Sequence, residues 1–147
     1  MVVFTGRNQR AQAILEREQW PVPATVRGIV PNVAEFMTAA DVIVTKPGSL
    51  TVAESLAMGR PLVLGRPLPG QEEGNVGYVV KAGAGLHYRS PQEAGEAVAY
   101  LLKDPAARWE MSRSAMRLAR PRATERTLDT LQGMVLRAET RPHALAS

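Results

Sequence analysis

The chain of 147 residues contains no cysteine and only two histidines. The lack of cysteine excludes disulfides, thiolate metal sites and cysteine nucleophiles, and it fits a reducing compartment. His87 and His143 stand far apart without nearby partners, so we expect no metal site. No apolar run approaches the ~20 residues that a membrane-spanning helix needs, and the first residues do not resemble a signal peptide. The remaining composition, 45% hydrophobic and 22% charged, is typical of one globular domain or one lobe of a larger protein.

The positive charge of the chain is concentrated at its C-terminal end. Residues 1–104 carry ten basic and ten acidic residues, whereas residues 105–147 carry eight arginines and four acids. Such an excess is typical of an anionic partner, either nucleic acid or a lipid surface, but we favour a solvated helix surface. Nucleic-acid binding needs exposed aromatic residues among the basic ones, and only Trp109 is available, so we expect no nucleic-acid partner.

Short apolar runs alternate with helical patterns along most of the chain. The sequence predicts strands over residues 2–5, 25–30, 42–45, 62–64 and 84–88. Between and after them it predicts helices over residues 9–18, 32–40, 50–58, 75–82 and 90–103. Asn32 with Glu35, and Ser90 with Glu93, have the spacing of helix starts. Because apolar strands that alternate with helices form parallel sheets covered on both faces, we predict a three-layer, Rossmann-like α/β domain.

We place this domain at residues 1–104, a helical C-terminal extension at residues 105–140 and a flexible tail at residues 141–147. In open parallel sheets, ligands bind at the carboxyl ends of the strands, beside helix N-termini. Three turns of the predicted domain lie at such ends.

The first of these turns runs from Thr45 to Glu54 and leads from a strand through Gly48 into a helix. The first N–H groups of that helix and its dipole favour a diphosphate, and Ser49 and Thr51 add hydroxyl donors. Glu54, one turn further on, could accept two hydrogen bonds from a ribose diol. Alternatively, Thr51 and Glu54 form a capping box, which needs no ligand, and the spacing leaves both interpretations open. The segment is neither a Walker motif nor a dinucleotide fingerprint.

The other two turns give weaker signals. Residues 69–75 place amide and carboxylate side chains on a glycine-flanked loop, which suits a ligand rich in hydroxyl groups, although composition favours a polar surface loop. Residues 27–30 end an apolar strand whose backbone groups could meet the edge of a flat base.

Taken in order, these segments resemble the C-terminal domain of the two-domain glycosyltransferases with the GT-B architecture. The resemblance is to monogalactosyldiacylglycerol synthases and processive diacylglycerol glucosyltransferases. It extends, more distantly, to the enzyme that adds N-acetylglucosamine to the undecaprenyl-linked peptidoglycan precursor. It covers residues 2–120 and rests on the ordered segments 2–8, 26–30, 40–48, 51–61 and 69–75.

The resemblance implies a role for each turn in binding a UDP-hexose donor. The implied nucleotide-binding residues are Gly28, Ile29, Val30, Lys46, Pro47, Gly48, Ser49, Leu50, Thr51 and Glu54. Among these, Ile29 and Val30 would hold the uracil through backbone groups, residues 48–51 the diphosphate, and Glu54 the ribose. The implied sugar-binding residues are Gly70, Gln71, Glu72 and Asn75.

The resemblance also implies an inverting transfer of a hexose, galactose or glucose, to a lipid acceptor such as diacylglycerol, without metal or cofactor. In the family, the catalytic base and the acceptor groove belong to the N-terminal domain, which has no counterpart in this chain. We therefore expect no catalytic residue here and no activity from this chain alone. The expected location is cytoplasmic, peripheral on the inner face of the plasma membrane, with contact to an anionic membrane surface.

The chain departs from the family pattern at its start, because the first strand of the C-terminal domain and its glycine-rich turn are missing. We expect the chain to be a truncated C-terminal half of a GT-B fold, with an exposed sheet edge beside Val2–Thr5 that favours self-association. Two alternatives are a stand-alone nucleotide-sugar-binding or regulatory module and a sugar-nucleotide epimerase of the same architecture.

Overall fold

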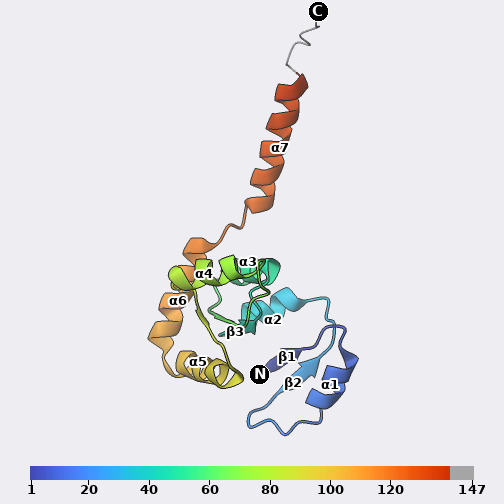
Figure 1. Cartoon of the computed structure of the whole chain (residues 1–147), viewed down its shortest axis with the longest axis vertical. Helices are drawn as coiled ribbons and strands as arrows, with labels where there is room; N and C mark the ends of the chain where they lie inside the picture. Colours follow the sequence, from blue (N-terminus) through green and yellow to red (C-terminus); the bar gives the residue numbers. More distant parts are fainter. Residues whose placement is uncertain (140–147) are drawn as a thin grey trace, which may run out of the picture. The chain divides into compact units, whose positions relative to one another are not determined.

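The computed structural model of the chain describes residues 1–139. Strands and helices alternate from β1 to α5, and two further helices follow (Figure 1). Contacts divide the chain into two units, Met1–Ala39 and Ala40–Ser147, and each has a parallel sheet of its own.

The first unit alternates strand and helix in four elements: β1 (Val2–Phe4), α1 (Gln9–Leu15), β2 (Thr25–Arg27) and α2 (Val33–Ala39). β1 and β2 pair in parallel, as a strand–helix–strand unit requires. Asn8 caps α1 because its side chain accepts a hydrogen bond from the N–H of Ala11 at 2.9 Å. Phe36 of α2 packs edge-on against Phe4 of β1, with ring centroids 5.2 Å apart.

Each of the four elements of the first unit is shorter than the sequence predicts, and the difference is largest for α1 and β2. The helix predicted over residues 9–18 ends at Leu15, whose carbonyl accepts a hydrogen bond from the indole N–H of Trp20 at 3.0 Å. The strand predicted over residues 25–30 ends at Arg27. The chain turns after β1 at Gly6, where φ is +58°, so β1 offers no partner to the residues that follow Arg27.

Within the described part of the chain, β1 pairs with β2 alone. Val2 and Phe4 of this strand are 44% and 39% exposed. Self-association through the free edge of β1 stays a prediction.

The second unit has eight elements: β3 (Ile43–Thr45), α3 (Ser49–Ala57), β4 (Leu62–Leu64), α4 (Glu73–Lys81), β5 (Gly85–His87), α5 (Pro91–Lys103), α6 (Pro105–Leu118) and α7 (Ala123–Glu139). β4 lies between β3 and β5, and both pairs are parallel. The carboxyl ends of the three strands therefore lie at one edge of the sheet. The predicted α/β class with parallel strands is confirmed.

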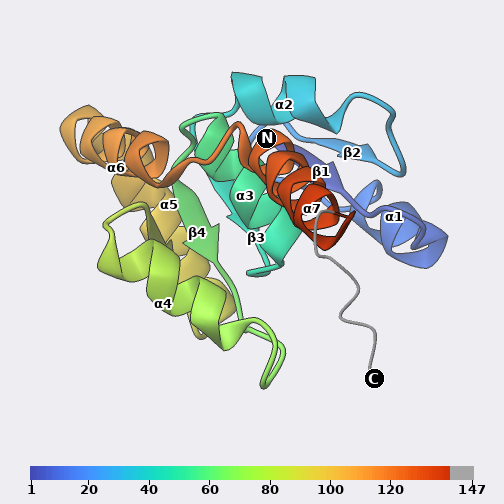
Figure 2. The ribbon, with the colours of Figure 1, turned by 90° about the horizontal axis from the view of Figure 1, so that it is seen from above.

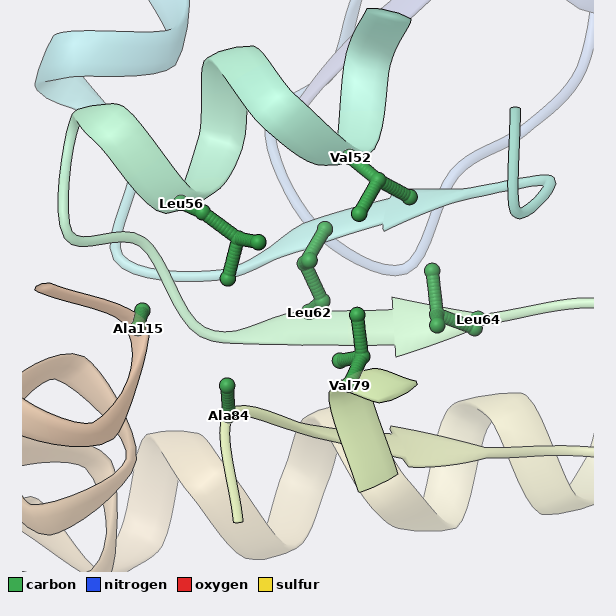
Figure 3. Packing of buried hydrophobic residues seen from close by; sticks show 7 residues of the cluster. All are labelled: Val52, Leu56, Leu62, Leu64, Val79, Ala84 and Ala115. Carbon is green, nitrogen blue, oxygen red and sulfur yellow. The ribbon is translucent and has the colours of Figure 1, made fainter. Parts of the chain in front are cut away.

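β4 carries a core on each of its two faces, because successive side chains of a strand point to opposite sides. Leu62 and Leu64 belong to one cluster, whereas Val63 packs with Leu101 and Met111 in another. The first cluster is completed by residues from α3, α4 and α6 and by the residue just before β5, as Figure 3 shows: Val52, Leu56, Val79, Ala115 and Ala84. In Figure 2, α3 and α4 lie in front of β4 and α5 lies behind it, which gives three layers.

The helices after the sheet begin at capped positions. Ser90 accepts a hydrogen bond from the N–H of Glu93 at 3.2 Å, so the helix start predicted for α5 is confirmed. Asp104 caps α6 in the same way by accepting from the N–H of Ala107 at 3.0 Å. In α6, the hydroxyl of Ser112 donates to the carbonyl of Gly59 at 2.6 Å.

α6 thus contributes to both clusters of the core, and the predicted domain boundary at residue 104 stays a prediction. The tail predicted over residues 141–147 lies outside the described residues. Among the described residues, no helix combines the length and apolar character needed to cross a bilayer.

Candidate functional site

The turn between β3 and α3 exposes the start of a helix to solvent. β3 ends at Thr45, and α3 begins at Ser49 after the N-cap residue Gly48. Gly48 has extended backbone angles and, having no side chain, makes no side-chain cap. The first N–H groups of α3 have no partner within the helix, and its dipole adds positive potential at this end. Such a helix start can bind an anion.

The capping-box interpretation of Thr51 and Glu54 is wrong. Gly48 is the N-cap, so Thr51 lies inside the helix rather than at its start. The carbonyl of Thr51 accepts a hydrogen bond from the hydroxyl of Ser55 at 2.7 Å. Glu54 is exposed one turn further along α3. The carboxylate of Glu54 therefore has no capping role and remains open to a ligand.

The loop between β4 and α4 lies next to this turn because β3 and β4 are neighbours, with Thr45 opposite Leu64. Glu72 ends the loop and is buried, with 6% of its surface exposed. One oxygen of its carboxylate accepts a hydrogen bond from the Nζ of Lys46 at 2.6 Å. The other accepts from the backbone N–H of Leu68 at 3.0 Å. Glu72 thus joins the two segments that follow neighbouring strands.

Asn75 joins the same two segments from the first turn of α4. Its side-chain amide donates to the carbonyl of Pro47 at 2.8 Å and contacts the hydroxyl of Ser49 at 3.1 Å. Residues 46–49 and 72–75 are therefore linked by three side-chain hydrogen bonds.

The hydrogen bond from Lys46 lowers the pKa of Glu72, and the N–H of Leu68 lowers it further. Both contacts favour the charged carboxylate. Because the pKa in the folded chain lies below that of the unfolded chain, this stabilisation is present above the unfolded pKa. It is lost as the pH falls through the folded pKa, so the ion pair is intact at neutral pH.

The structure brings together many, but not all, of the residues that the sequence predicts for the site. Lys46 is hydrogen-bonded to Glu72. Asn75 is hydrogen-bonded to Pro47 and Ser49. Four further predicted site residues of the second unit are exposed on the same segments: Leu50, Glu54, Gly70 and Gln71. Sequence reasoning missed Leu68, whose contribution is a backbone N–H that no side-chain pattern marks.

Gly28, Ile29 and Val30 belong to the first unit and follow the end of β2. Ile29 is 68% exposed, although the sequence predicts it within a strand. A Cβ atom on Gly28 would lie 2.9 Å from the side-chain oxygen of Gln12, so glycine allows α1 to pack closely at this point.

Among residues 1–139, no three histidine or acidic side chains lie close enough together to hold a metal ion. Independence from metal and cofactor stays a prediction.

Parallel strands with helices on both faces, and a glycine turn that opens a helix at the carboxyl end of a strand, define a Rossmann-like domain of the GT-B kind. The chain belongs to the family "Glycosyltransferase family 28 C-terminal domain", whose model matches residues 1–127. The resemblance stated from the sequence is confirmed.

Curated relatives include plant monogalactosyldiacylglycerol synthases. The chain is 42% identical over 124 residues to monogalactosyldiacylglycerol synthase 2 of Arabidopsis thaliana. This alignment covers 84% of this chain and 26% of that protein. It is 35% identical over 143 residues to monogalactosyldiacylglycerol synthase 1 of the same plant, covering 97% of this chain and 27% of that protein. The chain thus spans about a quarter of the length of these relatives.

Solved structures share the fold. MurG of Acinetobacter baumannii superposes with a TM-score of 0.69 at 24% identity, covering 90% of this chain and 43% of that one. The spinosyn rhamnosyltransferase SpnG, in a structure complexed with thymidine diphosphate, superposes with a TM-score of 0.60 at 22% identity. The superposition covers 87% of this chain and 35% of that one.

Proposed function

We propose that the chain is the donor-binding part of an inverting glycosyltransferase that transfers a hexose from UDP to a lipid acceptor such as diacylglycerol. The observation that carries the proposal is the turn at residues 46–48, which opens α3 toward solvent and leaves Glu54 exposed one turn further on. Family membership supports it, and the names of the curated relatives specify a galactolipid product.

In this proposal the start of α3 binds the diphosphate. Backbone N–H groups of residues 49–51 donate to phosphate oxygens, and Gly48 lets the ligand approach the backbone. The carboxylate of Glu54 accepts hydrogen bonds from the ribose hydroxyls. Ile29 and Val30 hold the uracil through backbone groups, and residues 70–75 hold the hexose through Gln71, Glu72 and Asn75.

The reaction we propose is a single displacement at the anomeric carbon. The helix dipole and the N–H groups at the start of α3 stabilise the charge that develops on the leaving diphosphate, in place of a metal ion. The base that deprotonates the acceptor hydroxyl is supplied from outside residues 1–147. Accordingly, we expect the chain alone to bind a donor without transferring its sugar.

Titration with UDP tests the donor site directly. We expect saturable binding by the chain, measured by calorimetry or by chemical-shift changes of the amides at residues 48–51. Glu54→Ala is expected to weaken binding by about tenfold to a hundredfold, since hydrogen bonds to a charged group contribute about 1.5–3 kcal/mol.

Glu110→Ala is the matched control, because Glu110 is also an exposed helical glutamate but lies on α6. Its affinity for UDP should equal that of the wild type. Absence of saturable UDP binding, or equal losses in both variants, would contradict the proposed donor site.

We also propose that the protein lies peripherally on an anionic membrane surface, on the cytoplasmic side. α7 exposes five apolar side chains by more than half. Four of them, with values from 52% to 60%, are Leu128, Leu131, Met134 and Val135. Their spacing of three or four residues places them along one face of the helix. An amphipathic helix of this kind can lie in the interface of a membrane when basic residues accompany it.

Basic residues gather around the start of this helix. A surface hollow of about 460 Å³ at the junction of α6 and α7 is lined by Arg120, Arg122 and Arg126, among others. Guanidinium groups match the geometry of phosphate oxygens and can hold them in pairs. A phospholipid headgroup therefore fits the chemistry of this hollow.

Cosedimentation with vesicles tests the membrane proposal. We expect binding to vesicles that contain phosphatidylglycerol, weakened by salt, and roughly a hundredfold loss on replacing Arg120, Arg122 and Arg126 by glutamine, at about 1 kcal/mol per arginine. The charge-matched control replaces the exposed arginines Arg7 and Arg10 together with Arg17. Equal losses in the two triple variants would contradict a specific role for the hollow.

A further inference from the structure

The carboxylate of Glu72 lies beside the glycine turn that opens α3. A Cβ atom on Gly48, the N-cap of α3, would lie 3.3 Å from the Nζ of Lys46 and 3.6 Å from the nearer carboxylate oxygen of Glu72. The ammonium and the carboxylate therefore both lie against the turn that opens the helix. The ion pair therefore lies beside the turn where the proposed function puts the donor diphosphate.

The two partners of this ion pair differ in how firmly they are held. The side chain of Glu72 is 8% exposed and has a second anchor in the N–H of Leu68, whereas the side chain of Lys46 is 66% exposed. No hydrogen bond other than that to Glu72 holds the ammonium among the described residues. An ammonium carries three donors on a flexible stem, so Lys46 can turn to another acceptor with little rearrangement.

We propose that Lys46 exchanges partners when a donor binds, leaving Glu72 for the diphosphate, and that the released carboxylate then accepts hydrogen bonds from the hexose. This inference rests on the proposed function and concerns the coupling between two parts of the same site. The diphosphate competes with Glu72 for the ammonium, so part of its binding free energy is spent on separating the pair. A donor that also carries a hexose recovers this cost, because the sugar hydroxyls give the carboxylate a new partner.

The exchange makes hexose recognition conditional on diphosphate recognition. While the pair is closed, one carboxylate oxygen of Glu72 is occupied by Lys46 and the other by Leu68. The diphosphate opens the pair and thereby prepares the hexose contact, which is positive coupling between the two parts of one ligand. The lowered pKa of Glu72 supports this mechanism, since the group that competes for Lys46 is ionised at neutral pH.

The test compares two variants whose effects on UDP affinity should have opposite signs. Glu72→Gln keeps a side-chain acceptor for Leu68 but removes the charge that competes for Lys46. It should bind UDP about twofold to fivefold more tightly than the wild type, as expected for release of a partly exposed ion pair. Lys46→Ala removes the ammonium itself and should weaken UDP binding by about tenfold, since a charge-assisted hydrogen bond to phosphate is lost.

A second measurement concerns the hexose. The ratio of the affinity for UDP-galactose or UDP-glucose to that for UDP should fall in Glu72→Gln, because the carboxylate that accepts from the sugar is gone. Glu73→Gln is the matched control: Glu73 is the next residue, exposed in the first turn of α4. It removes the same charge without touching Lys46 and should change neither the UDP affinity nor the ratio.

The outcomes separate this inference from the proposed function. Saturable UDP binding by the wild type with equal or weaker binding by Glu72→Gln would overturn the exchange and leave the donor site standing. The same holds if Glu73→Gln strengthens UDP binding as much as Glu72→Gln. Absence of UDP binding by the wild type and both glutamine variants would overturn the proposed function and the exchange with it.

Discussion

Replacing Gly85 by alanine is expected to destabilise the second unit by about 3 kcal/mol or more, which is the upper end of what overpacking of a core costs. Gly85 begins β5 and lies opposite Leu62 of β4. A Cβ atom there would lie 2.6 Å from the backbone oxygen of Leu62 and 2.8 Å from a methyl carbon of Val79. Because one of these atoms belongs to the backbone of the central strand, the strain cannot be relieved by rotating a side chain. The free energy of unfolding is measured by urea titration, with far-ultraviolet circular dichroism as the signal.

Gly95→Ala is the matched control for this substitution. Gly95 lies inside α5, and a Cβ atom there would meet nothing within 4 Å. Alanine in a helix interior is favoured over glycine by roughly 0.5–1 kcal/mol, so this variant should be slightly more stable than the wild type. If both variants unfolded at the wild-type urea concentration, the close packing of β5 against β4 would be contradicted.

The order of the elements could be predicted from the sequence because each one has a local signature. The strand over residues 62–64 is an unbroken apolar run, and its predicted bounds agree with β4. Ser90 and Glu93 lie three residues apart and mark the start of α5. Bounds that depend on a distant partner were less predictable. The strand expected to reach Val30 ends at Arg27 because β1, its partner, turns away at Gly6.

The division of the strands between two sheets could not be predicted from the sequence. Apolar runs that alternate with helices predict a parallel sheet, but they do not show which strands are neighbours. Pairing joins residues far apart in the chain, such as Val3 with Val26 and Val63 with Leu86. Nothing in the hydrophobic pattern distinguishes these pairs from others of similar composition.

The same limit applies to the site. The glycine turn and the position of Glu54 could be predicted because they lie within ten residues of one another and follow helix geometry. The partner of Lys46 could not, because Glu72 and Glu73 are adjacent in the sequence and have the same chemistry. Only the structure shows that Glu72 is buried beside Lys46, whereas Glu73 is exposed in the first turn of α4. The family resemblance implies Glu72 as a sugar ligand, and in the proposed exchange its ion pair with Lys46 opens before such a contact forms.

Leu101→Ala is the substitution that tests whether α6 belongs to the core of the second unit. Leu101 ends the apolar face of α5, is fully buried, and packs with Val63 of β4 and Met111 of α6. Its truncation leaves a cavity between three elements, and we expect a loss of about 2–5 kcal/mol in the free energy of unfolding. Urea unfolding measures the loss.

The neighbouring residue supplies the control. Leu102 is 52% exposed on the same helix, so Leu102→Ala makes the same chemical change without a cavity and should alter stability by less than about 0.5 kcal/mol. Amide hydrogen exchange adds a second readout, because a cavity beneath Met111 should loosen α6 and speed the exchange of its amides in Leu101→Ala alone. If the helical extension predicted over residues 105–140 were independent of the core, exchange in α6 would be the same in both variants. Faster exchange there would show instead that the packing of α6 depends on the core around β4.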